Sequence, residues 1–181
     1  MAIEQLVTKK MPSTSEIIEE IHLNFVRNYA IRKAILESEV LKDIEIFKII
    51  SNSCFNIALT EWCKLFGSER DQSHWKNCNE RGFSHINDVL QKVNIPESEF
   101  ESLKNDIKNF RDKYVSHADI KDIEELYVPY LSKVVEMVFF SYEIFSLRSF
   151  IYNKDLKLEF KQIYNDTQNI ENQYIRQNTN K

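Results

Sequence analysis

Residues 97–117 read ESEFESLKNDIKNFRDKYVSH, and this stretch decides the fold class of the chain. Its apolar side chains recur at intervals of three and four residues, at Phe100, Leu103, Ile107, Phe110 and Tyr114. An α-helix has about 3.6 residues per turn, so this spacing gathers them on one face. The stretch therefore predicts an amphipathic helix from about Glu97 to Ser116, with Pro96 at a position that favours a helix start.

The same periodicity continues along most of the chain. Two glycines and three prolines among 181 residues leave long segments uninterrupted. We predict helices at about 13–38, 42–66, 84–93, 97–116, 128–152 and 155–174. The fold class is therefore all-α: an up-and-down bundle of about five to six helices, in a single domain that spans residues 13–174. Residues 1–12 are expected to form a flexible arm, and residues 175–181 a frayed tail.

Several residues carry local expectations. Ser13 and Glu16 have the spacing of a capping box, which opens the first helix. Gly67 is expected to end the second helix in a left-handed conformation. His22 is expected at the surface or the edge of the core, and Glu61 in solvent rather than in a cleft. The second helix is expected to bury one side, formed by Phe47, Ile50, Cys54, Ile57, Ala58, Trp62 and Leu65.

Between residues 67 and 83 the periodicity breaks into polar residues, which predicts a surface excursion with a short helical turn around His74 and Trp75. Trp75 has two possible roles. Its ring could stack on a nucleic acid base, or it could fold onto the core as a lid, and we favour the lid.

The net charge and the cysteine content argue against several classes of function for this chain. A net charge of -4 argues against a protein that coats nucleic acid by bulk attraction. The three cysteines lack paired spacing and are expected to be reduced thiols in the cytoplasm. A zinc site from Cys63, His74, Cys78 and His85 would match no standard spacing, so we expect no metal and no cofactor. The start of the chain lacks a signal-peptide core, and charges interrupt the apolar segment 128–151, so we expect no membrane association.

The end of the 97–116 helix combines Arg111, Asp112 and His117. A permanently charged guanidinium near an imidazole that titrates close to neutral pH suits chemistry on a phosphate. The arginine would neutralise a phosphoryl oxygen while the histidine moves a proton. The structural alternative is a histidine that caps the last helix carbonyls, with the arginine at the edge of the core.

The segment LKNDIKNFRDKYVSHAD, from Leu103 to Asp119, resembles the motif of the HEPN superfamily. That motif has an arginine, then a polar residue, and a histidine after four to six intervening residues. Here the polar residue is Asp112, and five residues, Asp112 included, separate Arg111 from His117. The segment WCKLFGS, from Trp62 to Ser68, followed by His74 and Trp75, further resembles the subgroup related to the abortive-infection U phage-resistance proteins. The resemblance covers roughly residues 47–150.

This resemblance implies a helical homodimer in which two motifs face one cleft. It implies a metal-independent endoribonuclease, with His117 and Arg111 of both subunits acting on the RNA and Asp112 orienting one of them. It also implies a toxin or antiviral defence role, with an antitoxin or sensor protein as a further partner. The competing function class is a non-catalytic helical dimer that binds RNA, a nucleotide or a protein.

A basic track leads to this motif. Lys104, Lys108 and Arg111 are spaced by four and three residues and share a helix face, with Lys113 close by. We expect the three lysines to bind RNA. A solvated stripe in which Glu101 and Asp112 pair with these cations explains the same spacing equally well.

Overall fold

The computed structural model describes residues 12–67, 69–77, 85–116, 131–149 and 155–179. Within these ranges every regular element is helical, which confirms the all-α bundle. The elements are α1 (Thr14–Glu37), the 3-10 turn η1 (Leu41–Asp43), α2 (Glu45–Phe66), α3 (His85–Val93), α4 (Glu97–Ser116), α5 (Leu131–Ser149) and α6 (Leu156–Thr179). The bounds of α4 match the prediction from its apolar spacing.

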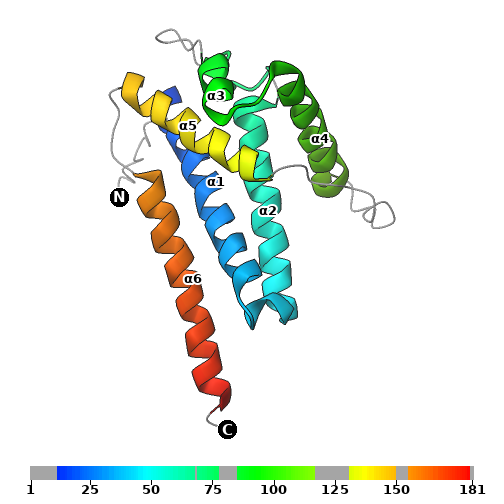
Figure 1. Ribbon diagram of the computed structural model, residues 1–181, viewed down its shortest axis with the longest axis vertical. Helices are drawn as coiled ribbons and strands as arrows, with labels where there is room; N and C mark the ends of the chain where they lie inside the picture. Colours follow the sequence, from blue (N-terminus) through cyan, green and yellow to red (C-terminus); the bar gives the residue numbers. More distant parts are fainter. Residues whose placement is uncertain (1–11, 68, 78–84, 117–130, 150–154, 180–181) are drawn as a thin grey trace, which may run out of the picture.

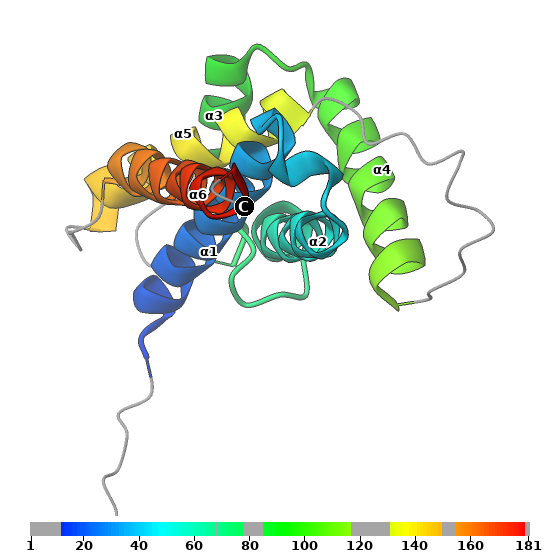
Figure 2. The ribbon, with the colours of Figure 1, turned by 90° about the horizontal axis from the view of Figure 1, so that it is seen from below.

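Four helices form a layer in the order α6, α1, α2 and α4 (Figure 1). Helices α1 and α2 are antiparallel and are joined through η1, while α3 and α5 pack together at one end of the layer. Seen from below, α1 lies between α6 and α2, and α4 lies beyond α2 (Figure 2). The largest buried side chains, among them Trp62, Phe25 and Phe66, fill the space between these elements.

The capping box at the start of α1 is confirmed. The amide of Glu16 donates to Ser13 Oγ at 3.3 Å, and the amide of Ser13 donates to a Glu16 carboxylate oxygen at 2.7 Å. Two helix-terminal N–H groups, which have no partner inside the helix, are therefore satisfied by two side chains three residues apart.

Helix α6 departs from a simple up-and-down order, because it runs parallel to α1. Glu159 accepts from Arg27 at 2.7 Å, and further along both helices Glu171 accepts from Ser38 at 2.7 Å. Helix α6 also continues to Thr179, beyond the predicted end near Tyr174, and Figure 1 shows it passing the tip of the α1–α2 hairpin. Its polar C-terminal residues stay helical because each still gains a backbone hydrogen bond.

His22 lies inside the core, so its predicted place at the surface or the core edge was wrong. Its ring bonds to the Ile18 carbonyl at 2.7 Å and to Ser141 Oγ at 3.1 Å, and only 1% of the residue is exposed. Burial lowers the pKa of His22 to about 4, although the Ile18 bond favours the protonated form. The ring is therefore neutral: Nδ1–H donates to Ile18, and Nε2 accepts from Ser141.

The buried side of α2 also differs from the prediction. Ile50 and Ile57 are exposed, whereas Phe55, Leu59 and Phe66 are buried. Phe55 contacts Phe110 of α4 with ring centroids 5.5 Å apart. The helix is turned so that its aromatic residues face α4 and the core, and this leaves its isoleucines outside.

Candidate functional site

Arg111 and Asp112 form the centre of the candidate site, in the last turns of α4. Arg111 Nε and Nη2 both donate to Asp112 Oδ1, at 2.9 and 2.6 Å. About a quarter of the Arg111 side chain and half of the Asp112 side chain remain exposed. The carboxylate thus fixes the orientation of a guanidinium that stays accessible to a ligand.

The electrostatic surroundings of Arg111 keep it charged. Burial would lower its pKa, but the bond to Asp112 and the nearby Cys63 and Asp71 raise it. Cys63 lies on α2, and burial raises the pKa of its thiol to about 11 even though Arg111 opposes this change. The thiol therefore stays protonated and is not an activated nucleophile. Sequence spacing could not reveal that Cys63 and Asp71 lie near Arg111, because this proximity depends on how α4 packs.

The lysines expected to bind RNA have different surroundings. Lys104 Nζ lies 2.6 Å from a carboxylate oxygen of Glu101, and its side chain is largely covered. Lys108 and Lys113 are exposed. Both ion pairs of the alternative interpretation are therefore present, Glu101 with Lys104 and Asp112 with Arg111. Lys108 and Lys113 are the lysines of the track whose side chains project into solvent.

The predicted catalytic histidine, His117, lies outside the described residues. It follows Ser116, the last residue of α4, so the backbone that leads to it begins one turn beyond Arg111 and Asp112. Of the predicted catalytic residues, Arg111 and Asp112 are in contact in the structure. The position of His117 relative to them stays a prediction.

The segment 69–77 closes the C-terminal end of α2. The amide of Trp75 donates to the Leu65 carbonyl at 3.0 Å, and Ser73 Oγ donates to the Lys64 carbonyl at 3.3 Å. Trp75 also packs against the hydrophobic core, in agreement with its expected role as a lid. The segment thus supplies partners for helix-terminal carbonyls that lack a partner within the helix.

Gly67 ends α2 for a different reason from the one predicted. Its φ of -88° and ψ of -48° are right-handed, so the expected left-handed conformation was wrong. A Cβ atom at this position would lie 2.8 Å from the Cys63 carbonyl oxygen. The close approach of the backbone to this carbonyl, and not a positive φ, favours glycine here.

His74 is a structural histidine. Its ring bonds to the carbonyl of Phe66, and its Nδ1 accepts from the amide of Lys76 at 3.2 Å. Burial lowers its pKa, so the neutral form is favoured. Both ring nitrogens are therefore engaged with the backbone. Among the described residues, no group of histidine, cysteine and carboxylate side chains could hold a metal ion.

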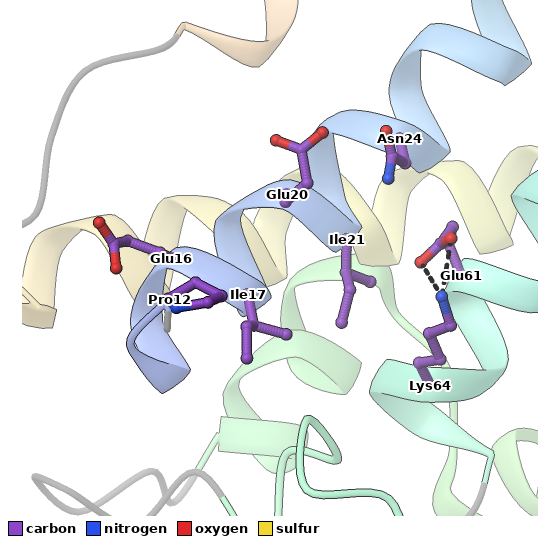
Figure 3. Close-up of a pocket in the computed structure, with 8 residues that line it drawn as sticks. All are labelled: Pro12, Glu16, Ile17, Glu20, Ile21, Asn24, Glu61 and Lys64. Carbon is purple, nitrogen blue, oxygen red and sulfur yellow. Dashed lines mark hydrogen bonds and ion pairs between the residues drawn. The ribbon is translucent and has the colours of Figure 1, made fainter. Parts of the chain in front are cut away.

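A hollow of about 460 Å³ lies between α1 and the C-terminal half of α2. Figure 3 shows Glu61 and Lys64 at one end of it and Pro12 and Glu16 at the other. Glu61 is buried, and Lys64 Nζ contacts its two carboxylate oxygens at 2.8 and 2.9 Å. Its expected place in solvent was therefore wrong, because α1 and Lys64 cover it. Neither Arg111 nor Asp112 lines this hollow.

Comparisons of the chain with protein-family models, with curated proteins and with solved structures find no match. The resemblance to the HEPN superfamily therefore remains a hypothesis based on residues 103–119 and 62–75. Trp62 and Phe66, which carry part of that resemblance, are core side chains with ring centroids 5.2 Å apart.

None of the helices in the described part of the chain is both long and apolar enough to cross a membrane.

Proposed function

We propose that this protein is a metal-independent endoribonuclease of the HEPN type, which acts as a homodimer. The observation that carries the proposal is the Arg111–Asp112 pair, in which one carboxylate oxygen holds two guanidinium nitrogens while the side chain stays accessible. A fixed and permanently charged guanidinium is suited to a phosphodiester whose negative charge grows during cleavage. Asp112 acts as its positioning residue.

In this mechanism the nucleophile comes from the RNA. His117 of one subunit accepts the proton of a ribose 2'-hydroxyl, and the 2'-oxygen then bonds to the adjacent phosphorus. The bond from phosphorus to the 5'-oxygen breaks, and His117 of the partner subunit gives that oxygen a proton. One histidine cannot be both base and acid in the same step, so two subunits are required. The products carry a 2',3'-cyclic phosphate and a 5'-hydroxyl.

Arginine supplies the charge stabilisation and histidine the proton transfer, so the chemistry requires no metal ion. We therefore expect purified protein to cleave labelled single-stranded RNA in the presence of EDTA. DNA of the same sequence should remain intact, because it lacks the 2'-hydroxyl. His117→Ala and Arg111→Ala should abolish cleavage, whereas Arg176→Ala, an exposed arginine on α6, should retain it. Cleavage by His117→Ala at the wild-type rate would refute the mechanism.

The alternative function is a non-catalytic helical dimer that binds RNA, a nucleotide or a protein partner. The net charge of -4 and the pairing of Lys104 with Glu101 favour it, because both weaken attraction for a polyanion. The same assay separates the two functions. RNA that is retained on the protein and remains uncut, with and without added divalent cations, would identify a binding module.

The defence role suggested by the resemblance belongs to this proposal. A nuclease that acts on cellular RNA needs a restraint, so an antitoxin or sensor protein is the partner we propose. Purification together with the products of neighbouring genes would test for it.

A further inference from the structure

Arg32 of α1 is a half-buried arginine that has no carboxylate partner among the described residues. The other half-buried arginines whose side chains are described, Arg27 and Arg111, each contact a carboxylate oxygen, at 2.7 and 2.6 Å. A charge that is withdrawn from water without an opposite charge beside it costs free energy. Arg32 thus carries a partly desolvated charge that no described side chain neutralises.

The three guanidinium nitrogens of Arg32 have different surroundings. Nη1 donates to the carbonyl oxygen and to the hydroxyl of Ser51, but these bonds are long, at 3.3 and 3.5 Å. Nε is buried and has no hydrogen-bond partner in the described chain. Nη2 has none either, and it is not among the buried atoms. Arg111 holds Asp112 through the same two nitrogens, Nε and Nη2, which in Arg32 are unpaired.

Phe55 of α2 fixes the orientation of this guanidinium. Its ring centre lies 4.1 Å from the guanidinium carbon Cζ of Arg32, which is a cation–π distance. A stacked guanidinium keeps its edge available for hydrogen bonds. Burial lowers the pKa of Arg32, and the groups that raise it are Tyr29 and Cys54, neither of which is a carboxylate. A cation that is held in one orientation and lacks a counterion is prepared to bind an anion.

The ring of Phe55 also connects Arg32 to the candidate site. Phe110 of α4 contacts the same ring, with the two ring centroids 5.5 Å apart. Arg111 follows Phe110 in the chain. Arg32 and the candidate site are therefore separated by two packed aromatic side chains.

The direction of α4 shows which end of the site is next to Arg32. Figure 1 shows α4 beside the C-terminal half of α2. In the first half of α4, Lys104 lies near Glu69, beyond the end of α2, whereas the later contact with Phe55 is midway along α2. The two helices are thus antiparallel. Arg32, which donates to Ser51 one turn earlier in α2, lies toward the C-terminal end of α4.

We propose that Arg32 binds a backbone phosphate of the RNA, beyond the phosphate that Arg111 would hold, an inference that rests on the proposed function. The guanidinium edge matches the oxygens of a phosphate. Lys48 is exposed and forms no ion pair with a described residue. It lies three residues before Ser51 and seven before Phe55, so it shares their helix face and adds a second positive charge. Arg32 is a positioning residue, since a phosphate contact fixes the place of the strand without taking part in the reaction.

Matched substitutions of two arginines on α1 test this role. Arg32→Met keeps an unbranched side chain on Phe55 and removes the charge, whereas Arg27→Met removes a charge that Glu159 already pairs. Arg32→Met should weaken the binding of a short single-stranded RNA roughly tenfold, and equally for different sequences. The slope of log affinity against log salt concentration should fall by about 0.7, the contribution of one phosphate contact on a single strand. Arg27→Met should change neither quantity.

Thermal unfolding of the same two variants should give the opposite order. Arg32→Met removes an uncompensated charge, so its thermal midpoint should equal or exceed that of wild type. Arg27→Met breaks an ion pair and should lower the midpoint. A lower midpoint for Arg32→Met together with wild-type RNA affinity would show that Arg32 only joins α1 to α2, and would overturn the proposal. Arg32→Lys, which keeps a charge without the fork, should also bind RNA more weakly than wild type.

NMR of the arginine side chains identifies the ligand. The Nε–Hε signal of Arg32, assigned by its loss in Arg32→Lys, would be followed during titration with inorganic phosphate and, separately, with the RNA. The RNA should shift this signal at concentrations at which inorganic phosphate does not, while the signal of Arg27 stays in place. A shift with inorganic phosphate but none with RNA would assign the site to a small phosphate compound and overturn the RNA contact. No shift with either would overturn the site.

The binding measurements do not require cleavage, so they separate this proposal from the nuclease. RNA that binds through Arg32 and remains uncut would support the phosphate site and refute the nuclease. Where RNA is cut, Arg32→Met should raise KM roughly tenfold and change kcat less, because Arg32 does not contact the reacting atoms. Cleavage by Arg32→Met with the wild-type KM would overturn the role of Arg32 and leave the nuclease mechanism standing.

Discussion

The buried neutral His22 predicts how stability depends on pH. Its folded-state pKa is about 4, against an ordinary value of 6.5. Below pH 6.5 the unfolded chain takes up a proton at this residue while the folded chain does not. The free energy of unfolding must therefore fall as the pH drops from 6.5 toward 4, and the stabilisation is fully present above pH 6.5. The gap between the two pKa values corresponds to about 3 kcal/mol.

The perturbation that reveals this contribution is His22→Gln. Glutamine does not titrate, and it retains a donor and an acceptor for the Ile18 carbonyl and the Ser141 hydroxyl. The variant will be less stable than wild type near neutral pH, because its amide fits the core less well. When the pH is lowered, the free energy of unfolding of the variant should fall less than that of wild type, by up to about 3 kcal/mol at pH near 4.

Urea unfolding followed by circular dichroism, at several values between about pH 7 and about pH 4.5, measures this difference. Carboxylates also titrate in this range, but they do so in both proteins, so the difference between the two pH profiles isolates His22. Parallel profiles would show that His22 is not a buried neutral group and would refute the reasoning.

Three further predictions concern a cap, a turn and the site. Ser13→Ala removes the acceptor for the Glu16 amide and should lower the free energy of unfolding by about 1 kcal/mol in urea titrations. Gly67→Ala should lower the thermal midpoint, because its Cβ would meet the Cys63 carbonyl, and an unchanged midpoint would contradict that account. Arg111→Lys keeps the charge but loses the fork that Asp112 holds, so RNA cleavage should fall roughly a hundredfold or more. Wild-type cleavage rates in this variant would argue against a phosphate-binding role.

The sequence predicted those features well that depend on interactions between residues close together in the chain. The capping box at Ser13 and the spacing from Phe100 to Phe110 depend on neighbours within one or two turns, and the structure confirms both. The orientation of α2 was predicted less well. Isoleucine and phenylalanine are similarly apolar, so the pattern could not tell which of them would face α4.

Contacts between distant segments account for the remaining differences. The burial of His22 depends on Ser141 of α5, and that of Glu61 on the cover from α1, neither of which is visible in local spacing. The same holds for Cys63 beside Arg111. In the candidate site, Arg111 and Asp112 could be identified from the sequence. The residues that surround them could be identified only from the folded structure.

The chemistry of the cleaved ends tests the proposed nuclease mechanism most directly. Wild-type protein would be incubated with a defined RNA in EDTA, and the fragments would be analysed by mass spectrometry. We expect 5' fragments that end in a 2',3'-cyclic phosphate, one water lighter than the linear phosphate, and no cleavage at a nucleotide whose 2'-hydroxyl is replaced by hydrogen. Cleavage at that nucleotide, or fragments that carry a 3'-hydroxyl and a 5'-phosphate, would contradict it.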